Sequence, residues 1–204
     1  MTEPHHVNVE PWLRGTHTDV DAVQRAVIHA LALAEEDIAK WCASLTDAEL
    51  NARPFGLSPV AFHIRHIARS LDRLLSYAEG TQLDATQLAA LRTELDANAT
   101  RDEVLAEFRA ALRTSADRIL AFAPGHYNVP RGVGRAALPT TLGGLLVHCA
   151  DHTQRHAGQA VTTAKLLVAM RLRETSGTPR NTRSRAKRRE QHEVPSEPSS
   201  SAAT

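Results

Sequence analysis

Apolar side chains recur at steps of three and four residues along most of the chain, and this spacing marks one face of an α-helix. In the first such run, Val20, Val23, Val27 and Ala30 share a face. No segment of useful length alternates apolar and polar residues as a half-buried strand does. The pattern predicts four long helices over residues 18–44, 58–80, 100–123 and 140–173, a shorter helix at 85–95, and an irregular loop at 125–139.

Residues that start and stop helices lie at the ends of these runs. Ser58 and Pro59 form a cap followed by a proline suited to the first turn, and Gly80 is a typical helix stop. Thr100 and Glu103 have the spacing of a capping box. Amphipathic helices of this length predict an all-α fold, a four-helix bundle with a long crossover connection.

The composition agrees with this fold class. The chain has 33 alanines but only four Phe, two Tyr and two Trp, which favours close-packed helices over sheets. Its 204 residues suffice for one ordinary domain, which we place at residues 12–174. Residues 175–204 have almost no apolar side chains. We expect this basic, Ser- and Pro-rich tail to be disordered, because it cannot bury enough surface to offset the entropy of ordering.

Charge and cysteine content exclude several classes of protein. The 24 basic and 23 acidic residues give a net charge of +1, which argues against a nucleic-acid binder. Two cysteines cannot form a disulfide framework. No apolar run approaches the roughly 18 residues of a membrane span, and the N-terminus lacks the pattern of a signal peptide. We therefore expect a cytoplasmic protein that acts on a small-molecule substrate. The oligomeric state stays open, a homodimer included.

Histidines carry the candidate chemistry. The predicted fourth helix contains His148, His152 and His156, each four residues from the next. Successive members are about 40° apart around the helix and about 6 Å apart along it, so His152 and His156 can chelate one ion. Residue 153 is a threonine rather than the glutamate of the H-E-x-x-H protease motif, so that function is not supported.

A complete site needs further ligands. The predicted second helix contains His63 and His66, and facing helices of a bundle bring their ligands together in or near the core. Three neutral imidazoles bind Zn²⁺, Ni²⁺, Fe²⁺ or Mn²⁺ and leave positions open. Cys149 shares the face of His152 and is either a thiolate ligand or a small buried side chain.

Two motifs resemble the DinB/YfiT-like superfamily. The string His152-Thr-Gln-Arg-His156-Ala-Gly158-Gln159 is similar to its H-x-x-x-H-x-G-Q signature on a late helix. Ser58-Pro59 followed by His66-Ile67-Ala68 is similar to its second-helix motif. The resemblance covers roughly residues 18–173. It implies a four-helix bundle with an unusual connection order.

The resemblance also implies a ligand set and an activity. The divalent metal would be held by His66, His152 and His156, with Cys149 left as a buried apolar residue. His63, His148 and Gln159 would orient ligands or contact substrate. Relatives often have an acidic residue three places after the second-helix histidine, where this chain has Arg69, so the carboxylate that would orient the ring is missing there.

Related proteins include thiol-dependent S-transferases and a mycothiol-dependent maleylpyruvate isomerase. The resemblance therefore implies a metal-dependent transferase that uses a low-molecular-weight thiol such as mycothiol, bacillithiol or glutathione. Two alternatives stay open. One is a metal-dependent hydrolase, and the other is a stress-related protein that binds metal or a small molecule without turnover.

Overall fold

The structure, a computed structural model, describes residues 9–96 and 98–176. The chain divides into a unit of residues 1–169 and a second unit of residues 170–204. The last helix ends at Thr175, and of the predicted tail, residues 175–204, all but the first two residues lie outside the described residues. In chain order the elements, with 3₁₀ helices labelled η, are η1 (Pro11–Leu13), α1 (Ala22–Cys42), α2 (Asp47–Asn51), η2 (Pro54–Gly56), α3 (Val60–Glu79), α4 (Ala85–Arg92), α5 (Arg101–Leu120), β1 (Pro130–Val133), β2 (Leu138–Thr141) and α6 (Leu142–Thr175).

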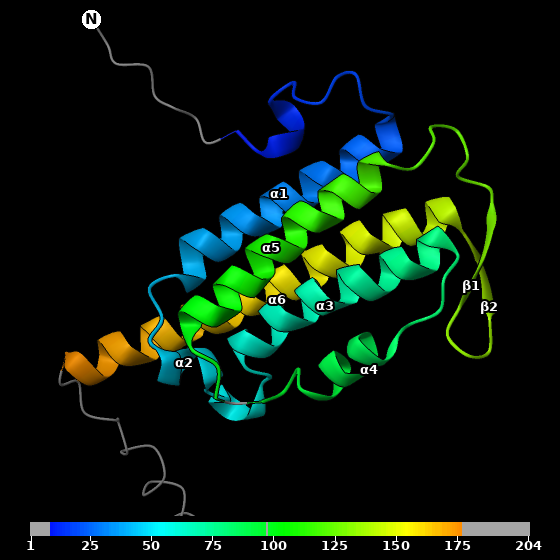
Figure 1. The fold of residues 1–204 in the computed structure, drawn as a ribbon. Helices are drawn as coiled ribbons and strands as arrows, with labels where there is room; N and C mark the ends of the chain where they lie inside the picture. Colours follow the sequence, from blue (N-terminus) through cyan, green and yellow to red (C-terminus); the bar gives the residue numbers. More distant parts are fainter. Residues whose placement is uncertain (1–8, 97, 177–204) are drawn as a thin grey trace, which may run out of the picture. The chain divides into compact units, whose positions relative to one another are not determined.

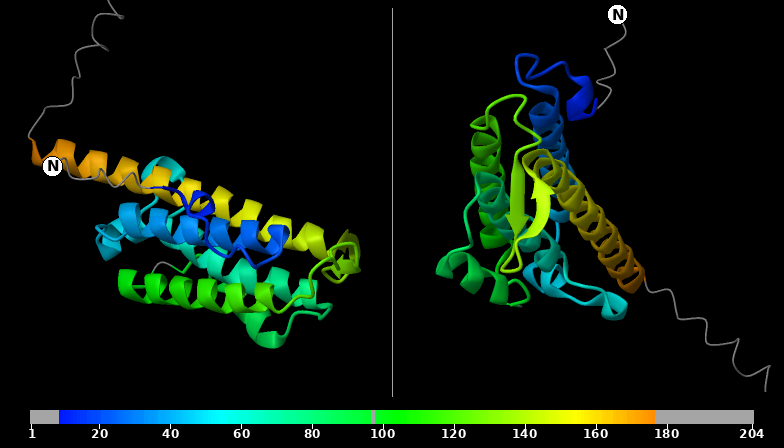
Figure 2. Two further views of the ribbon diagram at one scale, coloured as in Figure 1. Left: turned by 90° about the horizontal axis from the view of Figure 1, so that it is seen from above. Right: turned by 90° about the vertical axis from the view of Figure 1, so that its right-hand side faces the viewer.

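The first unit is a bundle of α1, α3, α5 and the part of α6 up to residue 169 (Figures 1 and 2). The predicted all-α bundle is thus confirmed. Each helix contributes large apolar side chains that are at most 1% exposed: Ile38, Ile64, Leu71, Phe108 and Leu146. Burial of each such side chain stabilises the fold by about 1.5–3 kcal/mol. None of the described helices has an apolar stretch able to cross a membrane.

Local capping sets the helix ends. Thr100 and Glu103 form the predicted capping box at the start of α5, and Gly80 ends α3 in the left-handed conformation, with φ of 85°. One detail differs from the prediction. Pro59, rather than Ser58, occupies the N-cap of α3, and no side chain caps that end.

The long crossover connection joins α3 to α5. These two helices pack against each other and run in the same direction (Figure 1), so residues 80–100 must return along the length of the bundle. The short helix α4 lies within this connection and none of its residues is buried. The crossover therefore covers one side of α3, and it contributes Ala99 to the core and packs Leu83 against it.

The segment predicted as an irregular loop, residues 125–139, is partly regular. Within the segment 125–139 and just beyond it, β1 and β2 form an antiparallel hairpin in which Pro130 pairs with Thr141. Its strands are four residues long and none of their residues is buried, so they show no apolar alternation. The Nε of Arg131 donates to the carbonyl of Ala78 at 2.5 Å and ties the hairpin to the end of α3.

Candidate metal centre

Three histidines converge where α3 faces α6. His66 comes from α3, and His152 and His156 come from successive turns of α6. One ligating atom from each lies within 4.8 Å of the others. The ring centroids are 4.9 Å apart for His66 and His152, 4.5 Å for His66 and His156, and 4.6 Å for His152 and His156. The rings therefore form a nearly equilateral triangle around one point.

The nitrogen spacing suits a transition metal. The Nε2 atoms of His66 and His152 are 3.2 Å apart. At a metal–nitrogen distance of about 2.1 Å, two ligands are about 3.0 Å apart in octahedral geometry and about 3.4 Å apart in tetrahedral geometry. The observed spacing falls between these values, so this pair fits an ion without rearrangement.

A carboxylate from the crossover orients His66. The Nδ1 of His66 lies 2.7 Å from Glu94 Oε2, while Arg73 Nη1 donates to Glu94 Oε1 at 2.7 Å. Glu94 is only 5% exposed. Burial raises the pKa of its carboxyl, but the hydrogen bonds from His66 and Arg73 outweigh burial and bring the pKa below its usual value. An ionised Glu94 accepts the Nδ1 proton, which leaves the Nε2 lone pair of His66 directed into the cluster.

Neighbouring rings also restrain His156 and His66. His63 Nδ1 lies 3.0 Å from His156 Nδ1, so His156 Nε2 is the nitrogen left to face an ion. Phe62 stacks on His66, with ring centroids 5.2 Å apart and planes inclined by 20°. These contacts restrict ring rotation, which favours a preformed cluster.

The histidines are held in the neutral form that a metal requires. Burial, followed by the charge of His66, lowers the pKa values of His63, His152 and His156 to about 4. A neutral imidazole offers a lone pair, whereas a protonated one does not. At neutral pH the cluster is therefore ready to bind a cation.

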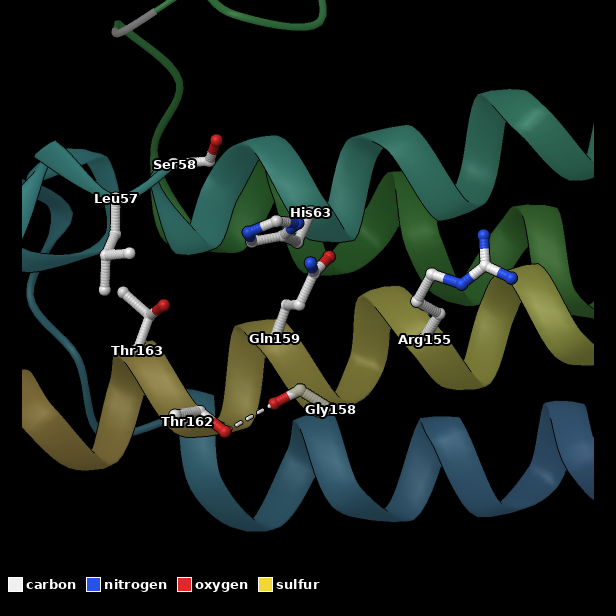
Figure 3. A pocket seen from close by; sticks show the side chains of 8 residues that line it. All are labelled: Leu57, Ser58, His63, Arg155, Gly158, Gln159, Thr162 and Thr163. Atoms are coloured by element: carbon white, nitrogen blue, oxygen red, sulfur yellow. Dashed lines mark hydrogen bonds between the residues drawn. The ribbon is translucent and has the colours of Figure 1, made fainter.

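Two cavities flank the cluster. A cavity of about 310 Å³, which we call the leucine cavity, is lined by His66, Ser70, Arg73, Leu74, Tyr77, Leu83, Leu91, His148 and His152. A second cavity of about 510 Å³ lies beside His63 and Gln159. Figure 3 shows the Gln159 amide directed from α6 towards His63. The three residues predicted to orient ligands or contact substrate are thus divided, with His148 in one cavity and His63 and Gln159 in the other.

Comparisons with known proteins concern the family and the fold of the chain. The DinB superfamily model matches residues 30–160, well over half of the chain. The chain belongs to the DinB superfamily. Among solved structures, a crystal structure of a conserved protein from Enterococcus faecalis is similar, with a TM-score of 0.61 and 22% identity over 74% of this chain and 99% of that one. At this identity the similarity concerns the fold. A comparison with curated proteins finds no match.

As a DinB protein, this chain departs from the usual motif in a way the structure explains. Arg69 replaces the acidic residue expected after His66, and its Nε donates to Glu107 at 2.6 Å. Glu94 supplies a carboxylate to His66 from a different element. The orienting carboxylate is therefore present in this DinB protein, but it comes from the crossover.

Cys149 lies apart from the DinB histidine cluster. It is fully buried in the apolar core, and burial raises the pKa of its thiol to about 12. A thiol in this state is a poor ligand compared with a thiolate. Cys149 thus has the surroundings of a buried apolar side chain.

Proposed function

We propose that this DinB protein is a metal-dependent transferase that joins a low-molecular-weight thiol to an electrophilic substrate. The observation that carries the proposal is a cluster of three imidazoles beside an open cavity. His66 and His152 both line the leucine cavity, so a molecule bound there lies against the ligand cluster. His66, His152 and His156 would hold one divalent transition metal.

The donor set suits such an ion. A metal bound by three uncharged ligands keeps its full charge and would lower the pKa of a bound thiol from about 8.5, so that the nucleophilic thiolate prevails at neutral pH. In the transfer, the thiol sulfur forms a bond to the electrophilic carbon, and the leaving group departs with the bonding electron pair. The thiol proton passes to solvent.

Residues around the cluster would hold the ligand rings in place during this reaction. Glu94 and Arg73 fix the ring of His66, and His63 fixes His156. His148 has a side chain 46% exposed at the edge of the leucine cavity. Its imidazole can take up the thiol proton and release it to solvent.

Glu94 also weighs against a binder without turnover. The absence of a carboxylate after His66 favoured that alternative, but Glu94 provides one. An oriented, three-ligand site with a cavity against it is typical of catalytic rather than structural metal sites.

A cobalt-substituted protein tests the proposal. We expect added glutathione or cysteine to produce a sulfur-to-cobalt charge-transfer band, and to be consumed with an electrophile such as 1-chloro-2,4-dinitrobenzene. The Cys149→Ala protein should behave identically, because Cys149 lies in the core. A band that precedes thiol addition and is lost in Cys149→Ala would contradict the proposal. Ester turnover without a thiol band would indicate a hydrolase, and neither signal would indicate a binder.

A further inference from the structure

One polar side chain that lines the leucine cavity has no partner among the described residues. Tyr77 is 9% exposed and lines the cavity from α3. Its hydroxyl makes no hydrogen bond to any residue that the structure describes. The hydroxyl is not among the buried polar atoms without a partner, so water can reach it in the cavity. The Tyr77 hydroxyl is therefore free to donate to an oxygen or nitrogen acceptor of a bound molecule.

The other polar groups of this cavity are already engaged. Arg73 donates to Glu94 through Nη1 at 2.7 Å and to Ser70 Oγ through Nη2 at 2.9 Å. The Ser70 hydroxyl also lies 3.4 Å from His66 Nε2. The charge of Arg73, the one Lys or Arg that lines the cavity, is thus balanced by Glu94. Apart from a metal held by the histidine cluster, no group that lines the cavity offers an uncompensated cation to an anionic ligand.

The remaining wall is apolar. Leu74 comes from α3, and Leu83 and Leu91 come from the crossover. Leu91 is 45% exposed, so it forms part of the rim. A volume of about 310 Å³ lies at the lower end of small-molecule sites. Such a wall favours an occupant with a short apolar body.

We propose that the leucine cavity binds a neutral, mainly apolar molecule with one carbonyl-type acceptor, to which the Tyr77 hydroxyl donates. This inference rests on the proposed function, because the occupant would be the electrophilic substrate held against His66 and His152. The leucines bind its apolar body, and the Arg73–Glu94 pair excludes carboxylates by leaving them unpaired. Tyr77 thereby selects the substrate class and fixes its orientation.

Two matched probes test the selection. 4-Phenylbutan-2-one presents a ketone on an apolar body, and 3-phenylpropanoate presents a carboxylate on a similar body. Binding is measured by calorimetry on the full-length metal-loaded protein and again after chelation, so that direct coordination of the carboxylate is recognised. We expect the chelated protein to bind the ketone at least about tenfold more tightly than the carboxylate.

Variants assign the effect to Tyr77. Tyr77→Phe removes only the hydroxyl and should weaken ketone binding about tenfold. Tyr127→Phe is the matched control, since Tyr127 contacts Gln24 away from the cavity, and it should leave binding unchanged. If Tyr77→Phe does not fold, Leu91→Arg at the rim serves instead. It should weaken ketone binding and strengthen carboxylate binding.

The outcomes separate this inference from the proposed function. Unchanged ketone affinity in Tyr77→Phe, or in Leu91→Arg where that variant replaces it, overturns the inference even if thiol transfer occurs. Equal affinity of the chelated protein for the ketone and the carboxylate also overturns the inference. If Tyr77→Phe weakens ketone binding but the protein transfers no thiol, the cavity assignment is supported and the proposed transferase function is contradicted.

Discussion

Two regions of this bundle bring histidines together, and they differ in what surrounds them. At the N-terminal end, the rings of His17 and His29 are 5.8 Å apart, and His29 Nε2 lies 3.0 Å from Thr16 Oγ1. Burial lowers the pKa of His29, and the charges of His17, Arg25 and Arg14 lower it further. This pair has basic neighbours and no acidic partner among the described residues.

The cluster of His66, His152 and His156 has partly buried rings and different surroundings. A third ring arrives from a facing helix, and Glu94 fixes the first ring through its Nδ1. Among the described residues, only this group brings three metal-ligating side chains together. The comparison shows that convergence and an orienting carboxylate, rather than local histidine content, distinguish a candidate metal site.

The largest expected effect comes from removing a ring in each region. His66→Gln should lower the affinity for Zn²⁺ or Co²⁺ by more than about a hundredfold, because it removes the only ligand from α3. His29→Gln should leave metal affinity unchanged. Metal content after dialysis and competition with a chromophoric chelator measure both. Full affinity in His66→Gln would show that the ligands are assigned wrongly.

A smaller effect is expected from the orienting carboxylate. Glu94→Gln keeps the size of the side chain but removes the charge that stabilises the Nδ1 proton of His66 and pairs with Arg73. Metal affinity should fall about 10–100-fold, as is typical of the groups that orient metal ligands. The same competition assay measures it, with Glu107→Gln as a control, since Glu107 pairs with Arg69 instead. Equal losses in both variants would argue for a general effect of charge.

The smallest effect concerns the pH dependence of stability without metal. His63, His152 and His156 have pKa values of about 4 in the folded protein and about 6.5 when unfolded. Between these values the unfolded chain binds more protons, so the free energy of unfolding should decrease as the pH falls from about 6.5 to about 4. Urea denaturation across this range measures the slope. His152→Gln should make it shallower, and an unchanged slope would contradict the assignment of a buried neutral ring.

The bundle could be predicted from the sequence because its signals are local. Thr100 and Glu103 cap α5, and Gly80 ends α3, through contacts within a few residues. The i, i+4 spacing of His152 and His156 likewise fixes their common face. The hairpin was not predicted because its strands are four residues long and none of their residues is buried, so they leave no apolar pattern.

Residues that complete the site could not be predicted in this way. Glu94 lies 28 residues after His66, beyond the end of α4, and no periodic pattern links the two. Only the path of the crossover places its carboxylate beside the ring. Phe62 and Tyr77 are equally inconspicuous in the sequence, because an aromatic residue in an amphipathic helix is typical of a core. The sequence shows only that Arg69 stands where a carboxylate is expected. The carboxylate that takes over its role, Glu94, belongs to another element.

The separation of the site residues along the chain has a consequence for synthesis. His66 and Glu94 leave the ribosome early, whereas His152 and His156 follow after more than 50 further residues. A nascent chain that ends before α6 therefore has only one of the three ligands. An ion held by all three histidines would therefore bind only after the last helix has emerged and docked, so that metal loading would follow completion of the bundle instead of nucleating it.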